Sequence, residues 1–374
     1  KTFNKIIVNT TINPMKTLFE IIVLLHGLLH VLGFAKAFHS NRIQQITTPI
    51  SKPMGLIWLS ASFLIITASI MSVLNVEYWF LFVVGGAVLS QFLIIVSWKD
   101  AKFGTIPNIG MLTAAILGFF AWSYYRDYKI DVQKHLLQSD NFPKTTLSEN
   151  DLEQLPSAVK KYLRSTGCLG KSKVNNFYVQ FVGKIRKDDN SDWMPFTSEQ
   201  YNVMNNPARL FFMNAVMKSL PVVGFHKFSQ GVAFMDVRLL SFLNVMYYDG
   251  EQMNRAETVT FFNDMCCMAP STLIDKRIHW KEISDNVVKA TFTHKPITIT
   301  AELFFNEIGE LINFKSNDRY NVDAGKNIPW STPLKNYKTI NGFTLATYAE
   351  AVYTYPDKSF PYGTFELVSI KYNY

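Results

Sequence analysis

Cysteine is scarce in this sequence of 374 residues, which contains Cys168 and the adjacent pair Cys266 and Cys267. Three cysteines do not make the even-numbered framework that holds small disulfide-rich domains together. The pair stands between Met265 and Met268, in an apolar stretch. We therefore expect buried, unreactive thiols rather than a redox pair.

The motifs of the commonest catalytic and nucleotide-binding sites are missing too. The chain has no G-x-S-x-G, H-E-x-x-H, G-x-x-x-x-G-K-[ST], G-x-G-x-x-G, C-x-x-C or EF-hand sequence. This absence argues against the enzyme classes that depend on these motifs, without excluding other enzymes. No cofactor is predicted.

Dense runs of basic residues are absent, although the formal net charge is +8. A protein that binds nucleic acid gathers its lysines and arginines into a patch or stripe, whereas here they are scattered. A net positive charge is also expected for a protein beside an anionic lipid surface, because the lipid head groups attract lysine and arginine. We therefore predict membrane lipids, and not nucleic acid, as partners, and the sequence leaves a protein partner unknown.

Charged residues are few before Tyr125, and four apolar stretches there approach the roughly 20 residues that a helix needs to cross about 30 Å of hydrocarbon. The second of them, Gly55–Leu74, has no charged residue. In contact with lipid, a helix is the way for such a segment to satisfy the hydrogen bonds of its backbone groups. The sequence thus predicts a transmembrane four-helix domain over residues 15–125. Its spans are Thr17–Phe38, Gly55–Leu74, Tyr78–Trp98 and Asn108–Tyr125.

Two connections between these spans, residues 37–54 and 99–107, carry more basic residues than the opposite side. Short cytoplasmic loops are enriched in lysine and arginine. This predicts an inner-membrane protein whose large C-terminal domain lies outside the cytoplasm. Met15 and Lys16 directly precede the first span. We expect Met15 to be the native start, and residues 1–14 carry no structural argument.

The first span holds two histidines, His26 and His30, which lie one turn apart on the same helix face. They could form a metal, haem or proton-transfer site, or they could make interhelical hydrogen bonds to serine or glutamine. A metal site with two ligands is incomplete, so no metal is predicted. We favour the hydrogen bonds, because polar side chains in apolar helices usually face other helices.

The remainder of the chain is a connector, residues 126–147, and a β-rich extramembrane domain, residues 148–374. Helical spacing of apolar residues predicts helices at Ser148–Arg164 and about Glu251–Cys267. Alternation of apolar and polar residues predicts the strands. These are Phe177–Arg186, Met194–Met204, Ala208–Met217, Val223–Val237, Val287–His294, Pro296–Phe305, Leu311–Ser316, Tyr337–Thr347 and Thr364–Tyr372.

The predicted fold class is α+β: an N-terminal four-helix transmembrane bundle, then a curved antiparallel β-sheet forming a half-barrel with about two helices. A long sheet with one apolar face must curl, and its concave side must be filled by helices, loops, its own side chains or a ligand. A hydrophobic cavity and a core filled by side chains both stay open at this point.

Several strings of this sequence resemble a family of uncharacterised bacterial membrane proteins that have four N-terminal spans and a domain of unknown function. The resemblance rests on Leu155–Leu163, Trp193–Gln200, Asn254–Pro270, Arg277–Trp280, Asp318–Tyr320, Trp330 and the loop Trp98–Asn108. It covers most of the chain after Met15 and implies no established activity. By fold-level analogy, the half-barrel also resembles the bacterial lipoprotein carriers, which bind acyl chains.

The best polar constellation lies on the second predicted helix of the β-rich domain, which carries Arg255, Glu257 and Asp264. The two acidic residues are seven positions apart and therefore share a face. A carboxylate pair or an arginine-binding surface would need this arrangement. Ion pairing with Arg319 or Lys276 is the structural alternative.

Four more residues complete the candidates for ligand binding. Asp318 and Arg319 follow a predicted strand, where they would either clamp an anionic head group or lock a loop. His279 is a candidate acid or base, and Trp330 comes from the strings that resemble the family.

Three hypotheses of function follow. The first is a membrane-anchored protein that binds a lipid or another apolar small molecule. The second is an enzyme acting on a membrane-derived substrate, with Glu257, Asp264 or His279 as acid or base. The third is a structural or sensory membrane module, which would expose a large apolar patch without a pocket.

Overall fold

The structure is a computed structural model and describes residues 14–39, 43–44, 46–139 and 145–373. The stretch before Pro14 lies outside the described residues, so the proposed start at Met15 stays a prediction. The chain forms two compact units, a helical unit that ends at Tyr124 and a β-rich unit that begins at Tyr125. Each unit is described by itself.

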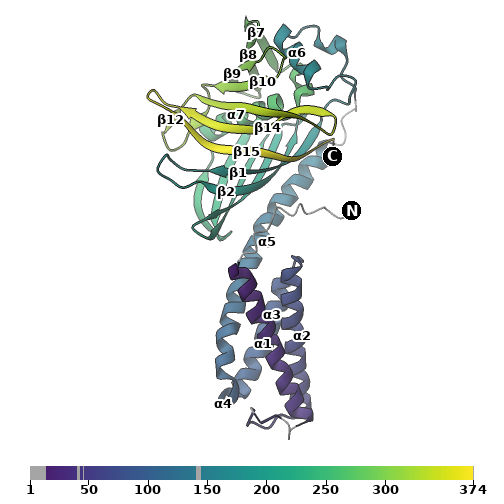
Figure 1. Ribbon diagram of the computed structural model, residues 1–374, viewed down its shortest axis with the longest axis vertical. Coiled ribbons are helices and arrows are strands. Elements are labelled where there is room, and N and C mark those ends of the chain that lie inside the picture. The colour runs from purple at the N-terminus through teal and green to yellow at the C-terminus, as the bar shows by residue number, and fades with distance from the viewer. Residues whose placement is uncertain (1–13, 40–42, 45, 140–144, 374) are drawn as a thin grey trace. The chain divides into compact units, whose positions relative to one another are not determined.

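The helical unit contains four long apolar helices, as predicted (Figure 1). Each is long and apolar enough to cross a membrane. The helices are α1 (Pro14–Phe38), α2 (Lys52–Val73), α3 (Trp79–Val96) and α5 (Thr105–Ser139), and the short α4 (Trp98–Ala101) and 3₁₀ turn η1 (Lys102–Gly104) precede α5.

Helices α1 and α2 approach each other closely where Gly33 lies against Trp58. A Cβ atom added at Gly33 would lie 2.1 Å from the indole Cδ2 of Trp58. Small residues at such contacts let apolar helices pack backbone to backbone, which is how helices associate in the absence of a hydrophobic driving force.

Helix α5 continues without a break to Ser139, and its part from Tyr125 onward belongs to the β-rich unit. The sequence suggested a polar connector here. Its polar residues line one face of the helix, while Tyr128 and Val132, four residues apart, are buried on the other. A helix that is apolar on one face alone is typical of a surface helix packed on a sheet.

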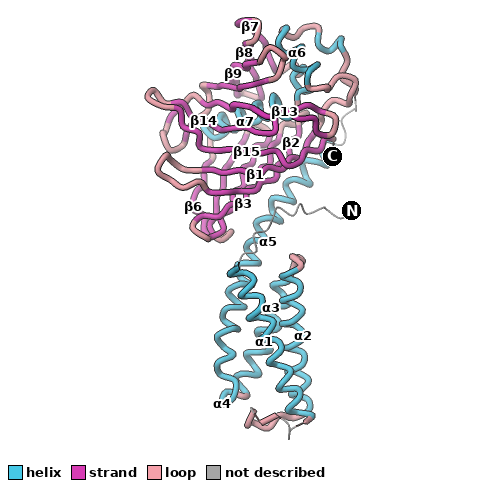
Figure 2. The backbone as a smooth tube through the Cα atoms, viewed as in Figure 1, coloured by secondary structure: helices cyan, strands magenta, loops and turns pink. Residues whose placement is uncertain are grey.

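The β-rich unit is built on one antiparallel sheet of thirteen strands (Figure 2). Its order is β6-β5-β4-β3-β2-β1-β15-β14-β13-β10-β9-β8-β7. The strands are β1 (Asn176–Ile185), β2 (Met194–Val203), β3 (Ala208–Met217), β4 (Leu220–Ser229), β5 (Val232–Leu239), β6 (Leu243–Tyr248), β7 (Ile278–Ser284), β8 (Val287–His294), β9 (Ile297–Phe305), β10 (Leu311–Ser316), β13 (Trp330–Ile340), β14 (Phe343–Thr354) and β15 (Ser359–Tyr372). A separate two-stranded hairpin joins β11 (Tyr320–Asn321) to β12 (Lys326–Asn327).

Two features of the connectivity explain the shape of the sheet. The last strand, β15, inserts beside the first, β1, and joins the two halves of the sheet. The edge strands β6 and β7 do not pair with each other in the described part of the chain, and helix α7 (Glu251–Met268) links them. The strands bend around α7, as Figures 1 and 2 show. The predicted α+β class and the curved, unclosed antiparallel sheet are confirmed.

Three predicted elements are each divided in two. A turn at Gln230 and Gly231 splits the predicted strand Val223–Val237, and a turn at Asn341 and Gly342 splits Tyr337–Thr347. All four turn residues have positive φ angles, the conformation of tight two-residue hairpins. The predicted helix Ser148–Arg164 is a 3₁₀ turn, η2 (Glu149–Leu152), and then α6 (Ser157–Ser165).

The physical reason for the last division is Pro156, which has an extended backbone and no N–H to continue a helix. Strands β6, β7 and the first half of β13 were not predicted, because their apolar and polar residues alternate weakly. Helices α6 and α7 correspond to the two helices predicted for this unit, and the end of α5 adds a third that was not predicted.

Helix α7 packs aromatic residues against the concave side of the sheet, over β4 and β8. Phe262 stacks on Phe292 of β8 with ring centroids 5.0 Å apart, and Phe261 lies 5.5 Å from Phe228 of β4. All four side chains are buried. The end of α5 covers the opposite, convex side, where Tyr128 lies between Phe212 and Phe225. The end of α5 therefore buries the convex face at β3 and β4, whereas on β8 and β9 one face stays half-buried or exposed.

Candidate functional site

A buried ionic cluster lies where α7 meets strands β2 and β3. Arg209 of β3 donates to Glu257 (3.1 Å) and to Asp264 (2.9 Å), both of which project from α7. The arginine is 7% exposed, Glu257 2% and Asp264 5%. The seven-residue spacing indeed aligns the two carboxylates, and one guanidinium pairs with both.

Two amides from β2 complete the cluster. Gln200 and Asn202 donate to Asp264 at 2.8 and 3.0 Å, and the carbonyl of Gln200 accepts from Arg209 at 2.9 Å. They stand on the concave side because alternate residues of a strand share a face, and Asn202 is paired with Arg209 in register. Buried charges are tolerated when hydrogen bonds satisfy them in this way.

The two carboxylates differ in their protonation behaviour. Burial alone would raise the pKa of Glu257, but Arg209, His226 and Arg319 together hold it below its usual value. For Asp264 burial prevails and raises the pKa, although Arg209 and Asn202 oppose it. Burial lowers the pKa of His226, on neighbouring β4, to about 4, so this histidine is neutral.

A second group of polar residues fastens the loop after β10 to α7. Arg255 pairs with Asp318 at 3.0 Å, and Asp318 also accepts from the backbone N–H and hydroxyl of Thr300. Arg319 donates to the carbonyl of Ala256 and to the hydroxyl of Thr260. These bonds hold the loop in place, which is one of the two roles that its sequence suggested.

Arg319 also lies against the aromatic lining of the sheet. Its guanidinium stands 4.7 Å from the ring centroid of Trp330, and the indole N–H donates to the hydroxyl of Tyr362 at 3.1 Å. Burial by itself would lower the pKa of Arg319. The nearby Tyr353, Tyr362 and Glu257 outweigh this effect and raise the pKa above its usual value, so the side chain stays charged. Its Nε is buried without a hydrogen-bond partner.

The ligand-binding candidates of the sequence therefore fall into two sets, with one residue outside both. Glu257 and Asp264 share the buried cluster, and the second group holds Arg255, Asp318, Arg319 and Trp330. His279 is exposed on the edge strand β7 and joins neither set. Arg319 or Lys276 was proposed as the counter-ion of the carboxylates, but Arg209 bonds both of them.

Sequence reasoning missed Arg209, Gln200, Asn202 and His226. A signal for the first three existed, because they are polar residues at inward positions of strands whose other inward residues are apolar. That signal is ambiguous without the register, since a shift by one residue turns every side chain to the other face.

The cysteines are free and buried, as expected from their apolar surroundings. Burial raises the pKa of Cys266 well above its usual value, and that of Cys168 as well. A thiol that stays protonated is a poor nucleophile. These residues therefore serve packing.

In the helical unit, a chain of hydrogen bonds connects three helices. His26 of α1 bonds Ser90 of α3 at 3.2 Å and Asn108 of α5 at 3.0 Å, and His30 bonds the same Ser90 at 2.9 Å. Asn108 donates onward to Gln91 at 3.0 Å. All but Gln91 are buried. This is the interhelical bonding that the sequence favoured over a metal or haem site.

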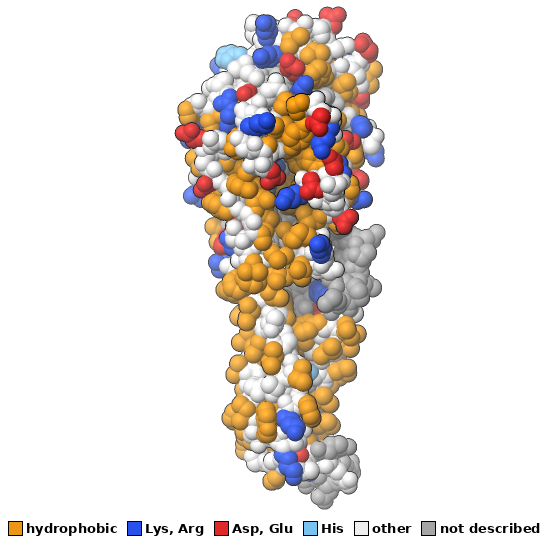
Figure 3. Space-filling view, turned by 90° about the vertical axis from the view of Figure 1, so that its left-hand side faces the viewer, with side chains coloured by type: hydrophobic (Ala, Val, Ile, Leu, Met, Phe, Trp, Pro, Cys, Tyr) orange, Lys and Arg blue, Asp and Glu red, His pale blue; other side chains and the backbone are white. Residues whose placement is uncertain are grey.

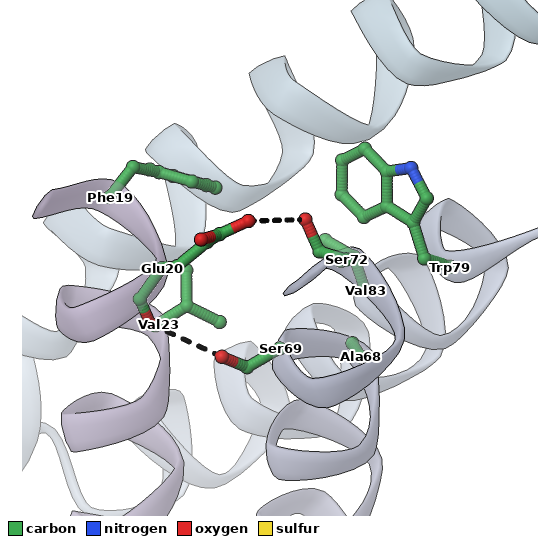
Figure 4. Close-up of a pocket in the computed structure, with 8 residues that line it drawn as sticks. All are labelled: Phe19, Glu20, Val23, Ala68, Ser69, Ser72, Trp79 and Val83. Carbon is green, nitrogen blue, oxygen red and sulfur yellow. Dashed lines mark hydrogen bonds between the residues drawn. The ribbon is translucent and has the colours of Figure 1, made fainter. Parts of the chain in front are cut away.

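Glu20 of α1 lines a small cavity of about 10 Å³ near the beginning of that helix (Figure 4). Its carboxylate accepts from Ser72 at 3.0 Å, and its carbonyl accepts from Ser69 at 3.2 Å. The space is too small for a ligand and holds at most one water. A larger, open groove of about 580 Å³ lies along α2 beside Leu59, Ser60, Phe63 and Leu64.

Fold and site together define a class of protein: helices long enough to cross a membrane, followed by an open antiparallel sheet wrapped around one buried helix. The comparison with protein families gives the particular one. The profile of the "Family of unknown function (DUF6544)" matches residues 145–365, more than half of the chain. The chain belongs to this family, which agrees with the resemblance found in its sequence.

Comparison with solved structures gives distant similarities. A domain from Vibrio parahaemolyticus assigned to outer membrane lipoprotein sorting is 8% identical, with 53% of this chain and 86% of that chain covered and a TM-score of 0.33. A DUF1329 family protein from Desulfovibrio piger is 9% identical, with 61% and 94% covered and a TM-score of 0.33.

A third solved structure is a β-barrel-like protein of the domain of unknown function DUF1849 from Brucella abortus. It is 8% identical, with 54% of this chain and 99% of that chain covered and a TM-score of 0.22. A search among curated proteins found no match.

Proposed function

We propose that this chain is a membrane-anchored protein whose β-rich unit binds a lipid or another apolar ligand on the concave side of its sheet. The four long apolar helices support the anchor. The distribution of basic residues supports an inner-membrane location with the β-rich unit outside the cytoplasm. Residues 15–125 would then form the membrane domain.

One observation carries the proposal: the apolar concave lining continues beyond the ionic cluster toward the far ends of β2 and β3. A second apolar cluster there contains Phe196, Phe211, Met213 and Ala215, with Ile185, Met194 and Phe365 packed against it. It is separate from the cluster around α7. Apolar surface on a concave face is the usual lining of a lipid site.

The polar residues beside this lining would serve as the other end of such a site. Arg209 lies next to Phe211, with its guanidinium 4.9 Å from that ring centroid. A lipid has the matching order of groups, an acyl chain for the apolar cluster and a polar head group for the ionic cluster. The ionic cluster would then contribute specificity rather than catalysis.

The enzyme hypothesis gains no support from the geometry. Both carboxylates are buried and already bonded to Arg209, whereas His279 is exposed on a different strand. A general acid or base must reach the proton that it transfers.

The test is photo-crosslinking of the full chain in vesicles that contain phosphatidylethanolamine with a diazirine in its acyl chain. We expect adducts on peptides of β2, β3 and β15, in addition to those on the apolar helices. Met213→Lys places a charge in the lining and should remove the adducts of the sheet while those of α1–α5 persist.

The matched control is Asn214→Lys, on the same strand but the exposed, opposite face. It should leave the adducts unchanged. Adducts confined to the apolar helices, in a chain that is folded by circular dichroism, would overturn the proposal.

A further inference from the structure

The connections between strands β3 to β6 differ in polarity between the two ends of these strands. At one end the connections contain Asn205 and Asn206, Gln230 and Gly231, and Asp249 and Gly250. These are the polar turn residues that water-exposed hairpins use. At the other end, residues 213–224 and 239–248 contain a single charged residue, Lys218. One sheet thus has a hydrophilic end and an apolar end.

The apolar end is exposed. The β3–β4 and β5–β6 hairpin tips, with the adjoining part of β6, present six large apolar side chains that are between 38% and 54% exposed: Val216, Met217, Leu220, Phe242, Leu243 and Val245. The tips are adjacent, because the N–H of Leu240 donates to the carbonyl of Pro221 at 2.9 Å. In the space-filling view hydrophobic side chains dominate the lower end of the β-rich unit, while charged ones are dispersed above (Figure 3).

One turn of this end keeps an apolar side chain at a position where the backbone conformation is unfavourable for it. Leu240 has a φ of 55°, a conformation that bulky residues rarely adopt and that Asn or Gly would take at less cost. Lys218, at φ 48°, is the charged residue of the β3–β4 tip. Apolar tips beside a lysine match a lipid surface, where side chains enter the acyl region and the amine meets phosphate.

The direction of the chain agrees with a lipid surface as the partner. Within the β-rich unit, α5 begins at Tyr125, beside Phe212, and ends with Gln138, which bonds Asn206 of the polar turn between β2 and β3. The chain therefore enters this unit from the side of the apolar tips. The residues of α5 that precede Tyr125 form one of the apolar helices.

We propose that the β3–β4 and β5–β6 hairpin tips dock into the surface of a lipid bilayer. The contact is made by Met217, Leu220, Phe242 and Leu243, with Lys218 on the phosphates. The surface ends at the β1–β2 connection, where residues 187–192 are all charged or polar. The inference does not depend on a ligand in the sheet, since the tips meet the bilayer whether or not the concave side is occupied.

The experiment measures the depth of single labels in the full chain, reconstituted into vesicles of equal parts phosphatidylcholine and phosphatidylglycerol. Leu220→Cys and Phe242→Cys are labelled with an environment-sensitive fluorophore. The natural cysteines are buried with raised pKa values and should react little, which the unsubstituted chain checks. The matched control is Asn205→Cys, in an exposed turn at the hydrophilic end.

We expect blue-shifted emission at positions 220 and 242 and quenching by spin-labelled lipid several-fold stronger than at position 205. Adding Leu240→Asn to the Phe242→Cys chain should weaken the quenching about twofold, and Asn suits the positive φ of that turn, so the fold is kept. Equal quenching at all three positions overturns the proposal. So does a blue shift without lipid quenching, which would show that the tips contact protein instead.

Discussion

Arg209 is the residue on which the interior of the β-rich unit depends. Its guanidinium joins two carboxylates of α7 to two amides of β2, in a region that is almost closed to water. A buried pair of this kind adds little stability compared with apolar residues of equal volume. Losing one partner is costly, however, because the other charges stay buried without compensation.

Arg209→Met should lower the free energy of unfolding by about 3–5 kcal/mol, because it leaves Glu257 and Asp264 without their cation. Thermal unfolding followed by near-ultraviolet circular dichroism measures the loss. Adding Glu257→Gln and Asp264→Asn should recover part of it.

Arg164→Met is the control for that substitution. Arg164 pairs with Glu149 at 2.8 Å, but both side chains are more than half exposed. Exposed pairs contribute about 0–1 kcal/mol. A loss as large as that of Arg209→Met would show that burial of the cluster does not explain the effect.

Two histidines, the half-buried His226 and the buried His294, make the β-rich unit sensitive to acid. Burial lowers the pKa of both His226 and His294 to about 4 in the folded chain, against 6.5 for an ordinary histidine. As the pH falls from about 6.5 to about 4, the unfolded chain takes up protons that the folded chain does not. Stability should therefore decline over this range by up to about 1.4 kcal/mol per pH unit for each histidine.

The measurement is the midpoint of thermal unfolding between pH about 7 and about 4.5. The His226→Gln, His294→Gln double variant should lose part of the acid sensitivity that the parent chain shows. His279→Gln, on an exposed residue, should retain it. Identical pH dependence in all three chains would contradict the assignment.

Among the elements, α5 has two environments along one uninterrupted helix. Its first part is apolar on nearly all sides, and its last part is apolar on the face that covers the sheet. Tyr128 is fully buried there between Phe212 and Phe225. Lys227 of β4 pairs with Asp131 at 2.7 Å at the border of the same contact. The sheet thus receives a helix on its convex side that the sequence did not predict.

Tyr128→Ala should destabilise the β-rich unit by about 3–5 kcal/mol, as truncation of a buried aromatic residue does. Ile130→Ala is the matched control on the same helix, because Ile130 is 56% exposed and should change stability by about 0.5 kcal/mol or less. Chemical denaturation followed by the aromatic circular dichroism of this unit separates the two. Equal losses would mean that the end of α5 does not cover the sheet.

Turn chemistry explains the errors in element boundaries. Gln230–Gly231 and Asn341–Gly342 are hairpin turns in which two consecutive residues have positive φ. Each lies within an apolar run that reads as one long strand. Recognising Asn-Gly as a turn signal was possible from the sequence, whereas Gln-Gly is a weaker signal.

At the scale of the whole molecule, the two units differ in how they distribute apolar side chains between surface and interior. The helical unit exposes many large apolar side chains, and the β-rich unit buries an extensive apolar core between its sheet and α7. The average composition hides this division. The family match over residues 145–365 falls entirely within the β-rich unit, which begins at Tyr125.

The sequence by itself determined the local properties of this protein. Four long runs without charge predict apolar helices because backbone groups must be satisfied within a helix in lipid. Alternation of period two predicts strands, and a surplus of them over helices predicts a curved sheet. Glu257 and Asp264 share a face because their spacing is two turns of a helix.

Only the tertiary structure decided which residues meet. The insertion of β15 beside β1, the choice of Arg209 as counter-ion and the docking of α5 on the convex face all join segments far apart in the chain. A local pattern carries no information on register between distant strands. The free energy of burying apolar surface, summed over all the strands and helices of the unit, selects that arrangement.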